Sequence, residues 1–411
     1  MKYNSVGDGM NIFKKVFIRT YQKVLYIASY FLPFKEPIII KGENSFTDLA
    51  IKLKFYKKDN VLLVSDETLH NLKLDENLIN VLKKENINFT SYYNINPNPS
   101  INEVEQGVIL YKQNNCNAII AIGGGSVMDA AKIIGARVSN YKTPINKMKG
   151  LLKIRKRLPM LIAIPTTAGT GSEVTVAAVI TNKESKEKFP IEDYKLIPTL
   201  AILNPSLLVN LPPHITSTTG MDALTHAIEA YIGKANTKNT KQAAITAIQL
   251  IFNNLYESYV NPFNMLAREK MQVASYFAGV AFTRAYVGYV HALAHTLGGQ
   301  YNVAHGLANA IILPIVLKEY GDSVINKLAE LYDYVIVNSP LSKKEKAKKF
   351  IEMIEELNNK MNIKNNFKEI IKEEDIDSLA KKAYKEAIPL YPTPTLWDLN
   401  KFKEMYYKIK K

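Results

Sequence analysis

The feature that most constrains the fold is a change in hydrophobic pattern near residue 206. Before it, short β-branched runs alternate with stretches that suit helices, at residues 38–40, 61–64, 118–122 and 161–164. After it, no strand is predicted. Apolar residues recur instead with helical spacing, in residues 221–232, 240–259, 265–281, 343–361 and 374–386. Alternating strands and helices indicate a parallel sheet covered by helices. The sequence therefore predicts an α/β domain followed by an all-α domain.

Length and composition agree with two domains. The chain has 411 residues, of which 47% are hydrophobic and 22% charged, so it is neither disordered nor collagen-like and has enough apolar residues for two cores. We expect residues 1–34 to form a helical extension, 35–206 the α/β domain and 207–411 the all-α domain. The single cysteine, Cys116, permits no intrachain disulfide, so the cytoplasm is the expected compartment.

The extension superficially resembles a signal peptide, because Lys14 and Lys15 precede an apolar run at 24–32. Tyrosines and a serine interrupt that run, no small-residue cleavage site follows it, and it is too short to span a bilayer. It is predicted to be an amphipathic helix that ends before Pro33. The helix either packs on the body of the protein or lies on a membrane surface, and we favour packing.

The net charge of +15 raises the question of an acidic partner. Lysines are spread over most of the predicted surface helices, and dense clusters occur only in residues 142–157 and 408–411. Such diffuse charge is typical of solvated surfaces. We therefore expect no nucleic-acid partner and no stable membrane insertion.

The strongest motif of the first half is an apolar strand, 118–122, that runs into Gly123, Gly124 and Gly125 and then into a helix beginning near Ser126. Free backbone N–H groups and the positive end of that helix can bind a phosphate, with no Cβ in the way. The spacing is neither the Rossmann fingerprint nor a Walker A motif. The alternative is that the glycines only make a tight turn.

Two neighbouring segments favour a nucleotide. Residues 164–173 place hydroxyls and glycines after another strand, where they either wrap a pyrophosphate or cap a helix. Asp66 follows the strand at 61–64 and could accept hydrogen bonds from a ribose, or else serve as a helix N-cap. In the ribose interpretation the carboxylate repels a 2′-phosphate, so NAD(H) is expected rather than NADP(H).

Histidines concentrate in the second half, in two short apolar helical segments. Asp222 and His226 stand at i and i+4, as do His291 and His295, so each pair shares a helical face. Gly298 and Gly299 can break the second helix, after which a further histidine, His305, can return toward the same point. A lone histidine in such a segment is usually a core residue, but this concentration favours a metal centre.

Three imidazoles and a carboxylate form a donor set that suits Fe(II) or Zn(II), and the lack of thiolates argues against a structural zinc site. An open coordination position would admit an alcohol oxygen. The cation would then stabilise the alkoxide, which is the form that expels hydride.

At these residues the chain resembles the iron-containing (group III) alcohol dehydrogenase family. The resemblance runs from about residue 37 to the C-terminus and rests on GGGSVMDAAK, PTTAGTGSEVT, TGMDALTHAIEAY and the histidine-rich segment. It implies a dehydroquinate-synthase-like fold, in which an N-terminal nucleotide-binding domain and a helical metal-binding domain hold cofactor and metal in a cleft between them. We also expect a homo-oligomer.

The resemblance implies a role for each matching residue. The metal ligands would be Asp222, His226, His291 and His305, and His295 would relay a proton beside the metal. The cofactor residues would be Asp66, Asn98, Gly124, Gly125, Ser126, Thr166, Thr167, Lys188 and Leu207. Asn204 and Arg284 depart from residues common in relatives, which leaves the substrate open.

The sequence thus predicts an NAD-dependent enzyme that transfers hydride between the cofactor and a primary alcohol/aldehyde pair. A second possibility on the same fold is a zinc polyol dehydrogenase, a lactaldehyde reductase or a hydroxyacid-oxoacid transhydrogenase. A remote alternative is a basic protein that binds nucleic acid or a membrane surface.

Overall fold

The structure is a computed structural model that describes residues 10–185 and 187–411. Its residue contacts divide the chain into two compact units. Among the described residues, unit 1 comprises 10–32, 213–260 and 284–411, and unit 2 comprises 33–185, 187–212 and 261–283. The three-part division at residues 34 and 206 stays a prediction, because contacts alone do not show which segments fold independently.

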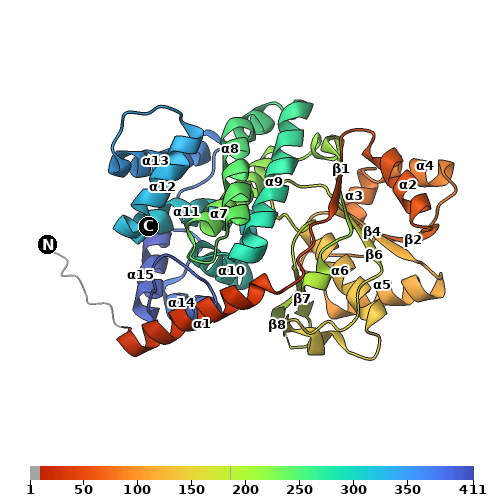
Figure 1. Ribbon diagram of the computed structural model, residues 1–411, viewed down its shortest axis with the longest axis horizontal. Coiled ribbons are helices and arrows are strands. Elements are labelled where there is room, and N and C mark those ends of the chain that lie inside the picture. The colour runs from red at the N-terminus through yellow and green to blue at the C-terminus, as the bar shows by residue number, and fades with distance from the viewer. Residues whose placement is uncertain (1–9, 186) are drawn as a thin grey trace. The chain divides into compact units, whose positions relative to one another are not determined.

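Unit 2 is built on a six-stranded parallel sheet with the order β1-β9-β6-β4-β2-β3 (Figure 1). Its strands are β1 (Ile38–Lys41), β2 (Asn60–Val64), β3 (Asn88–Tyr92), β4 (Ala118–Gly123), β6 (Met160–Pro165) and β9 (Leu200–Leu203). The four predicted runs are β1, β2, β4 and β6, whereas the polar edge strand β3 and the short β9 gave no clear signal. Every residue of β4 is buried, as expected of a strand that is covered on both faces.

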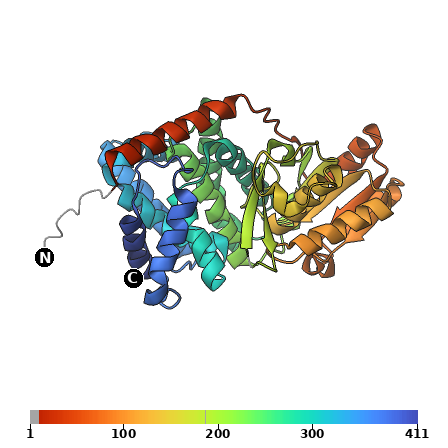
Figure 2. The same cartoon turned by 90° about the horizontal axis from the view of Figure 1, so that it is seen from below.

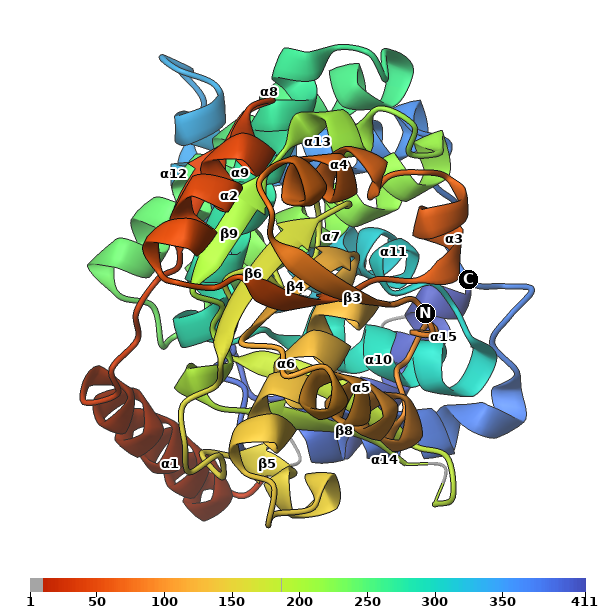
Figure 3. The same cartoon turned by 90° about the vertical axis from the view of Figure 1, so that its right-hand side faces the viewer.

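Helices cover both faces of this sheet. The helices of unit 2 are α2 (Ser45–Phe55), α3 (Glu67–Asn71), α4 (Glu76–Lys84), α5 (Ile101–Gln113), α6 (Gly125–Ser139) and most of α9 (Met265–Ala285). Figure 3 shows α5 and α6 on one face and α2 and α4 on the other. Each pair of helices shares a separate buried apolar cluster with the sheet. The predicted parallel-sheet domain is confirmed.

A second, three-stranded sheet has the order β5-β8-β7. It consists of β5 (Gly150–Leu151), β7 (Ala177–Asn182) and β8 (Glu187–Glu192), and β7 and β8 pair antiparallel. The 3-10 turns of unit 2 are η1 (Ile145–Met148), η2 (Tyr194–Leu196) and η3 (Pro205–Leu208). Strand β7 contacts α6, so the hairpin lies beside the helix that follows the glycine triplet.

The regular secondary structure in the described part of unit 1 consists of helices alone. Its α-helices are α1 (Ile12–Tyr30), α7 (Pro213–Ile232), α8 (Lys238–Val260), α10 (Tyr289–Tyr301), α11 (His305–Tyr320), α12 (Ile325–Val335), α13 (Lys343–Lys360), α14 (Ile376–Ala387) and α15 (Leu399–Lys410). Two 3-10 turns, η4 (Gly321–Val324) and η5 (Glu373–Asp375), join them. The segments predicted to be helical lie in α7, α8, α9, α13 and α14. Helix α7 packs against α8 and α11, and α10 packs against α11 and α14.

Helix α10 corrects one interpretation of the sequence. Gly298 and Gly299 can break a helix, but α10 continues through both and ends at Asn302, which adopts the left-handed conformation. Tertiary contacts with α11 and α14 outweigh the roughly 1 kcal/mol that each glycine costs in a helix interior. The turn that leads from α10 to His305 therefore begins at Asn302, four residues after Gly298.

Helix α1 is the predicted N-terminal helix. The side chain of Asn11 caps its start by accepting a hydrogen bond from the Phe13 N–H, and the helix ends ahead of Pro33. It packs on unit 1 through Ile18, which joins a small buried cluster with Leu396. The structure therefore confirms the favoured interpretation, in which this helix packs on the body of the protein.

Candidate functional site

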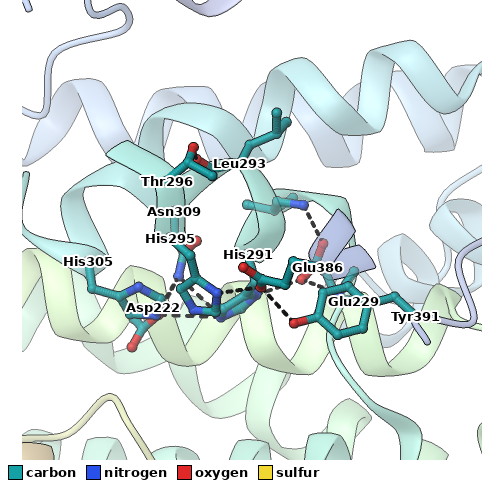
Figure 4. Close-up of polar contacts among 12 residues, drawn as sticks. Asp222, Glu229, His291, Leu293, His295, Thr296, His305, Asn309, Glu386 and Tyr391 are labelled. Atoms are coloured by element: carbon teal, nitrogen blue, oxygen red, sulfur yellow. Dashed lines mark hydrogen bonds and ion pairs between the residues drawn. The ribbon is translucent and has the colours of Figure 1, made fainter. Parts of the chain in front are cut away.

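Four candidate ligands converge inside unit 1. Helix α7 supplies Asp222 and His226, α10 supplies His291, and His305 is the first residue of α11. One donor atom from each of the four lies within 4.8 Å of the donor atoms of the other three. The structure thus brings together the four residues that the sequence proposed as ligands. Figure 4 labels three of them, Asp222, His291 and His305.

The distances suit a divalent cation. Oδ1 of Asp222 lies 3.3 Å from Nε2 of His305 and 3.8 Å from Nε2 of His291. Ligand atoms about 2.1 Å from a tetrahedral metal ion lie about 3.4 Å from one another. The rings of His226 and His291 stack with centroids 4.4 Å apart.

The amide of Asn309 shows where a cation would fit. Its Nδ2 lies 2.6 Å from Oδ1 of Asp222, 3.2 Å from Nε2 of His291 and 3.1 Å from Nε2 of His305. A carboxylate oxygen and two imidazole nitrogens therefore lie within 3.2 Å of one amide nitrogen. This set of nitrogen and oxygen atoms fits a divalent ion.

Close packing of helix α11 on α7 makes this convergence possible. A Cβ on Gly306 would lie 2.3 Å from the carbonyl oxygen of Thr218, so only glycine allows the two backbones to approach so closely. This contact holds the start of α11, and with it His305, next to Asp222. The glycine after the histidine is thus part of the site geometry.

Burial favours the neutral form of two of the imidazoles, those of His226 and His291. Burial lowers the pKa of His226 to about 3, against the attraction of Asp222. Burial likewise moves the pKa of His291 well below its usual value. For Asp222, burial would raise the pKa, but the imidazoles of His305 and His226 outweigh it and hold the carboxyl ionised. Neutral imidazoles and an ionised carboxylate are the forms that bind metals.

Glu229 orients His291. The Nδ1 of His291 lies 2.6 Å from Oε2 of Glu229, which also accepts the Gly288 N–H, while Oε1 accepts the Val290 N–H. A carboxylate against Nδ1 fixes the proton there and leaves Nε2 as the lone-pair donor. Burial raises the pKa of Glu229 to about 7, although its hydrogen bonds oppose that shift.

The role of Glu229 was missed in the sequence, although a signal was present. Glu229 lies seven residues after Asp222 and three after His226, which places all three on one face of α7.

His295 lies at the edge of the cluster and is partly exposed. Its ring stacks on that of His305 with centroids 5.1 Å apart, and its Nδ1 lies 2.6 Å from Oε1 of Glu386. The hydroxyl of Tyr391 donates to the same carboxylate oxygen at 2.8 Å. Glu386 and Tyr391 carry no spacing signal, because they are about 90 residues away from His295 in the sequence.

In unit 2 most of the predicted cofactor residues gather at the carboxyl edge of the sheet. The sheet order reverses between β2 and β4, which is where open α/β sheets bind ligands. Asp66 follows β2, and Gly124, Gly125 and Ser126 follow β4. The backbone of Thr166 donates to the carbonyl of Gly123, which places Thr166 and Thr167 beside the glycines.

Close packing explains why glycine is found at the start of α6. Gly124 is the N-cap residue, and a Cβ on Gly125 would lie 3.2 Å from Cγ2 of Thr170 in the facing loop. Asp66 caps α3 by accepting the Leu69 N–H, which was the alternative to ribose binding. The other alternative, in which residues 164–173 cap a helix, is wrong, since β7 follows that loop.

The remaining cofactor residues lie elsewhere in unit 2. Lys188 donates to Oδ1 of Asn98 at 2.7 Å. Burial lowers the pKa of Lys188, and Asp129 on α6 opposes the shift, so this pair faces the helix that follows the glycines. Leu207 packs in the apolar cluster on one face of the sheet. Cofactor contacts of Asn98, Lys188 and Leu207 stay predictions.

A buried lysine that the sequence did not single out holds the loop at 166–176 in place. Nζ of Lys132 lies within 3.1 Å of four acceptors, on Ser172, Thr175 and Ala177. Burial lowers the pKa of Lys132 to about 8, and Asp129 opposes that shift. Through these bonds α6 fixes the loop that lies next to the glycines.

Comparisons with known proteins agree with both halves of the chain. Residues 37–205 match the model of iron-containing alcohol dehydrogenase, and residues 216–409 match the C-terminal model of the Fe-containing alcohol dehydrogenase family. The NAD-dependent methanol dehydrogenase of Bacillus methanolicus is 36% identical over 362 residues, covering 88% of this chain and 94% of that protein. The 1,3-propanediol dehydrogenase of Citrobacter freundii is 36% identical over 350 residues, covering 84% and 90%.

Solved structures show the same architecture. A 1,3-propanediol oxidoreductase superposes with a TM-score of 0.88 at 32% identity, covering 92% of this chain and 99% of that one. An alcohol dehydrogenase from Oenococcus oeni gives 0.88 at 33% identity, covering 92% and 100%. These matches confirm the predicted dehydroquinate-synthase-like fold. Together with the family models, they show that the chain belongs to the iron-containing alcohol dehydrogenase family.

Proposed function

We propose that this protein transfers hydride reversibly between NAD(H) and a primary alcohol/aldehyde pair, with Fe(II), or Zn(II) in its place, held by Asp222, His226, His291 and His305. The observation that carries the proposal is the convergence of a carboxylate oxygen and two imidazole nitrogens on one amide nitrogen of Asn309. Reduction of short-chain aldehydes is the expected direction.

The bound cation would supply a Lewis acid that stabilises the alkoxide form of the substrate. The residues around it have separate tasks. Glu229 keeps the proton of His291 on Nδ1, so that Nε2 stays a ligand. His295, held at Nδ1 by Glu386, exchanges a proton with the substrate oxygen through its other nitrogen.

In unit 2 the N–H groups of Gly125 and Ser126 at the start of α6 would bind the pyrophosphate, assisted by the hydroxyls of Thr166 and Thr167. Asp66 would hydrogen-bond the adenosine ribose and disfavour a 2′-phosphate. Support comes from the position of these residues at the sheet reversal, and from the name of the methanol dehydrogenase relative, which is NAD-dependent.

We also propose a cytoplasmic homo-oligomer. The single cysteine, Cys116, is buried and forms no disulfide, which suits a reducing compartment. None of the helices in the described ranges has both the length and the hydropathy needed to cross a bilayer. Sedimentation velocity would measure the oligomeric state.

The test is anaerobic purification with metal quantification, followed by NADH oxidation against a panel of aldehydes, polyol ketones and oxoacids. We expect one metal ion per chain and turnover with short aldehydes. His226→Ala should lose both metal and turnover, whereas His214→Ala, an exposed histidine on the same helix α7, should keep both. Full activity of a metal-free His226→Ala protein would refute the metal site. If the enzyme turned over a polyol or hydroxyacid couple faster than an aldehyde, the proposed primary alcohol/aldehyde substrate class would be wrong.

A further inference from the structure

Helix α1 presents its apolar side outward. Phe13, Phe17 and Phe31, the residue that follows the helix, are 80%, 65% and 84% exposed, and smaller apolar residues between them are exposed as well. The exposed apolar set comprises Ile12, Phe13, Val16, Phe17, Val24, Ile27 and Phe31. Spacings of three and four residues align most of it along one side of the helix, and we call this set the α1 face.

The inner side of α1 is the more polar one. Gln22 is buried and donates from Nε2 to the carbonyl oxygens of Pro389 and Tyr391, at 2.9 and 2.8 Å. Arg19 donates to the carbonyl of Pro394 at 3.2 Å. Only Ile18 contributes a fully buried aliphatic side chain. These directional bonds fix the rotation of the helix, so the α1 face cannot turn inward without breaking them.

Within residues 10–185 and 187–411 the α1 face stays uncovered. Figures 1 and 2 show α1 along the outside of unit 1, with the other helices of that unit on one side of it. A contiguous exposed apolar strip of this kind marks an interaction surface rather than an ordinary protein exterior.

The charge of the helix identifies the partner. α1 carries Lys14, Lys15, Arg19 and Lys23 and no acidic residue. Two copies of α1 packed face to face would bring these like charges together without an acidic side chain of α1 to pair with them. An anionic surface complements them, and an apolar strip flanked by lysines is the pattern of a helix that lies in a membrane interface.

We propose that α1 is a membrane-surface anchor that places this enzyme on anionic lipid. At 19 residues the helix is about 28 Å long and lies flat, with the phenylalanines among the acyl chains and Lys14 and Lys23 at the headgroups. This is peripheral adhesion without bilayer insertion. It is independent of the proposed catalytic site and adds to the enzyme activity.

The test is flotation of the full-length protein with vesicles of phosphatidylcholine alone or mixed with phosphatidylglycerol. We expect binding to the mixed vesicles that weakens in high salt, because the ionic part is screened. Phe13→Ser with Phe17→Ser should lower the partition coefficient by about tenfold or more, from the loss of two apolar side chains. Lys14→Glu with Lys23→Glu should abolish the preference for the anionic lipid.

Matched controls are Phe263→Ser and Val337→Ser, each at a residue outside α1 that is 73% exposed. Both should bind vesicles as the parent protein does, and all variants should keep the NADH-dependent activity and melting temperature. Failure of the parent protein to bind phosphatidylglycerol vesicles would overturn the anchor. So would undiminished binding by the double serine variant. A smaller assembly in sedimentation for that variant, without vesicle binding by the parent, would assign the α1 face to a second copy of the chain instead.

Discussion

Replacement of Glu229 by glutamine tests how the metal site is held together. The carboxylate is buried and accepts three hydrogen bonds, from the Gly288 and Val290 N–H groups and from Nδ1 of His291. An amide has only one oxygen, so its NH₂ group must face at least one of these donors. The backbone of Gly288 lies so close to this carboxylate that a Cβ there would be 2.6 Å from Oε1 of Glu229.

The size of the effect follows from these bonds. A buried donor left without its acceptor costs about 1–3 kcal/mol, and His291 loses the negative charge that fixes its proton on Nδ1. Loss of such a partner weakens metal binding by about 10- to 100-fold, or about 1.4–2.8 kcal/mol. We therefore expect Glu229→Gln to have a metal dissociation constant raised by that factor while the fold persists.

The assay is competition of the metal-free protein with a chelator of known affinity, at several pH values. Since burial raises the pKa of Glu229 to about 7, the parent protein should lose affinity as pH falls through 7, when a proton on the carboxyl competes with the His291 hydrogen bond. In Glu229→Gln this pH-dependent loss of metal affinity should vanish. Glu330→Gln, which changes a carboxylate that accepts from Tyr231 on α7, is the control. A metal affinity of Glu229→Gln within twofold of the parent would refute the reasoning.

Three further predictions concern single residues. Asp66→Gly should narrow the difference in KM between NADH and NADPH, because it removes the charge that repels a 2′-phosphate, and steady-state kinetics with both cofactors measures this. His295→Gln should keep stoichiometric metal and cofactor affinity but lower kcat by about 100-fold or more and alter its pH profile, as expected of a proton relay. Lys132→Met should destabilise the protein by about 1–3 kcal/mol in denaturant unfolding, since it leaves the acceptors on Ser172, Thr175 and Ala177 without their donor.

Each of these has a control. Asp66→Asn keeps an oxygen to cap α3 but loses the charge, so it should reproduce the change in cofactor preference without a loss of stability. A parent enzyme that prefers NADPH would contradict that prediction. For His295→Gln, loss of metal would make this residue a ligand, and an unchanged pH profile with reduced stability would make it a packing residue. Lys83→Met, at an exposed lysine of α4, should leave stability unchanged, and an equally stable Lys132→Met would show that the buried network is dispensable.

The parts of the site that could be read from the sequence are those that depend on one helix or one strand end. Because the helical repeat is 3.6 residues, Asp222 and His226 must share a face wherever α7 lies, and so must His291 and His295. The same reasoning places Glu229 on the face of α7 that carries Asp222 and His226. A strand that runs into three glycines and a helix likewise fixes the start of α6 locally.

Other features depend on residues far apart in the chain. Glu386 meets His295 only because α10 packs against α14, and Asn309 meets Asp222 only because Gly306 lets α11 approach α7. No spacing in the sequence encodes these contacts. The helix through Gly298 and Gly299 is a similar case, because the contacts of α10 with its neighbours offset the low helix propensity of glycine.

The N-terminal helix shows most clearly which properties are local to the sequence and which depend on the tertiary structure. The sequence by itself determined that α1 is a helix, that it ends ahead of Pro33 and that it is amphipathic, since capping, proline geometry and periodicity are local properties. Only the tertiary structure decided which side is buried. The carbonyl groups of Pro389 and Tyr391 can be satisfied by Gln22 and not by a phenylalanine, so hydrogen bonding turned the polar side inward and left the apolar side exposed.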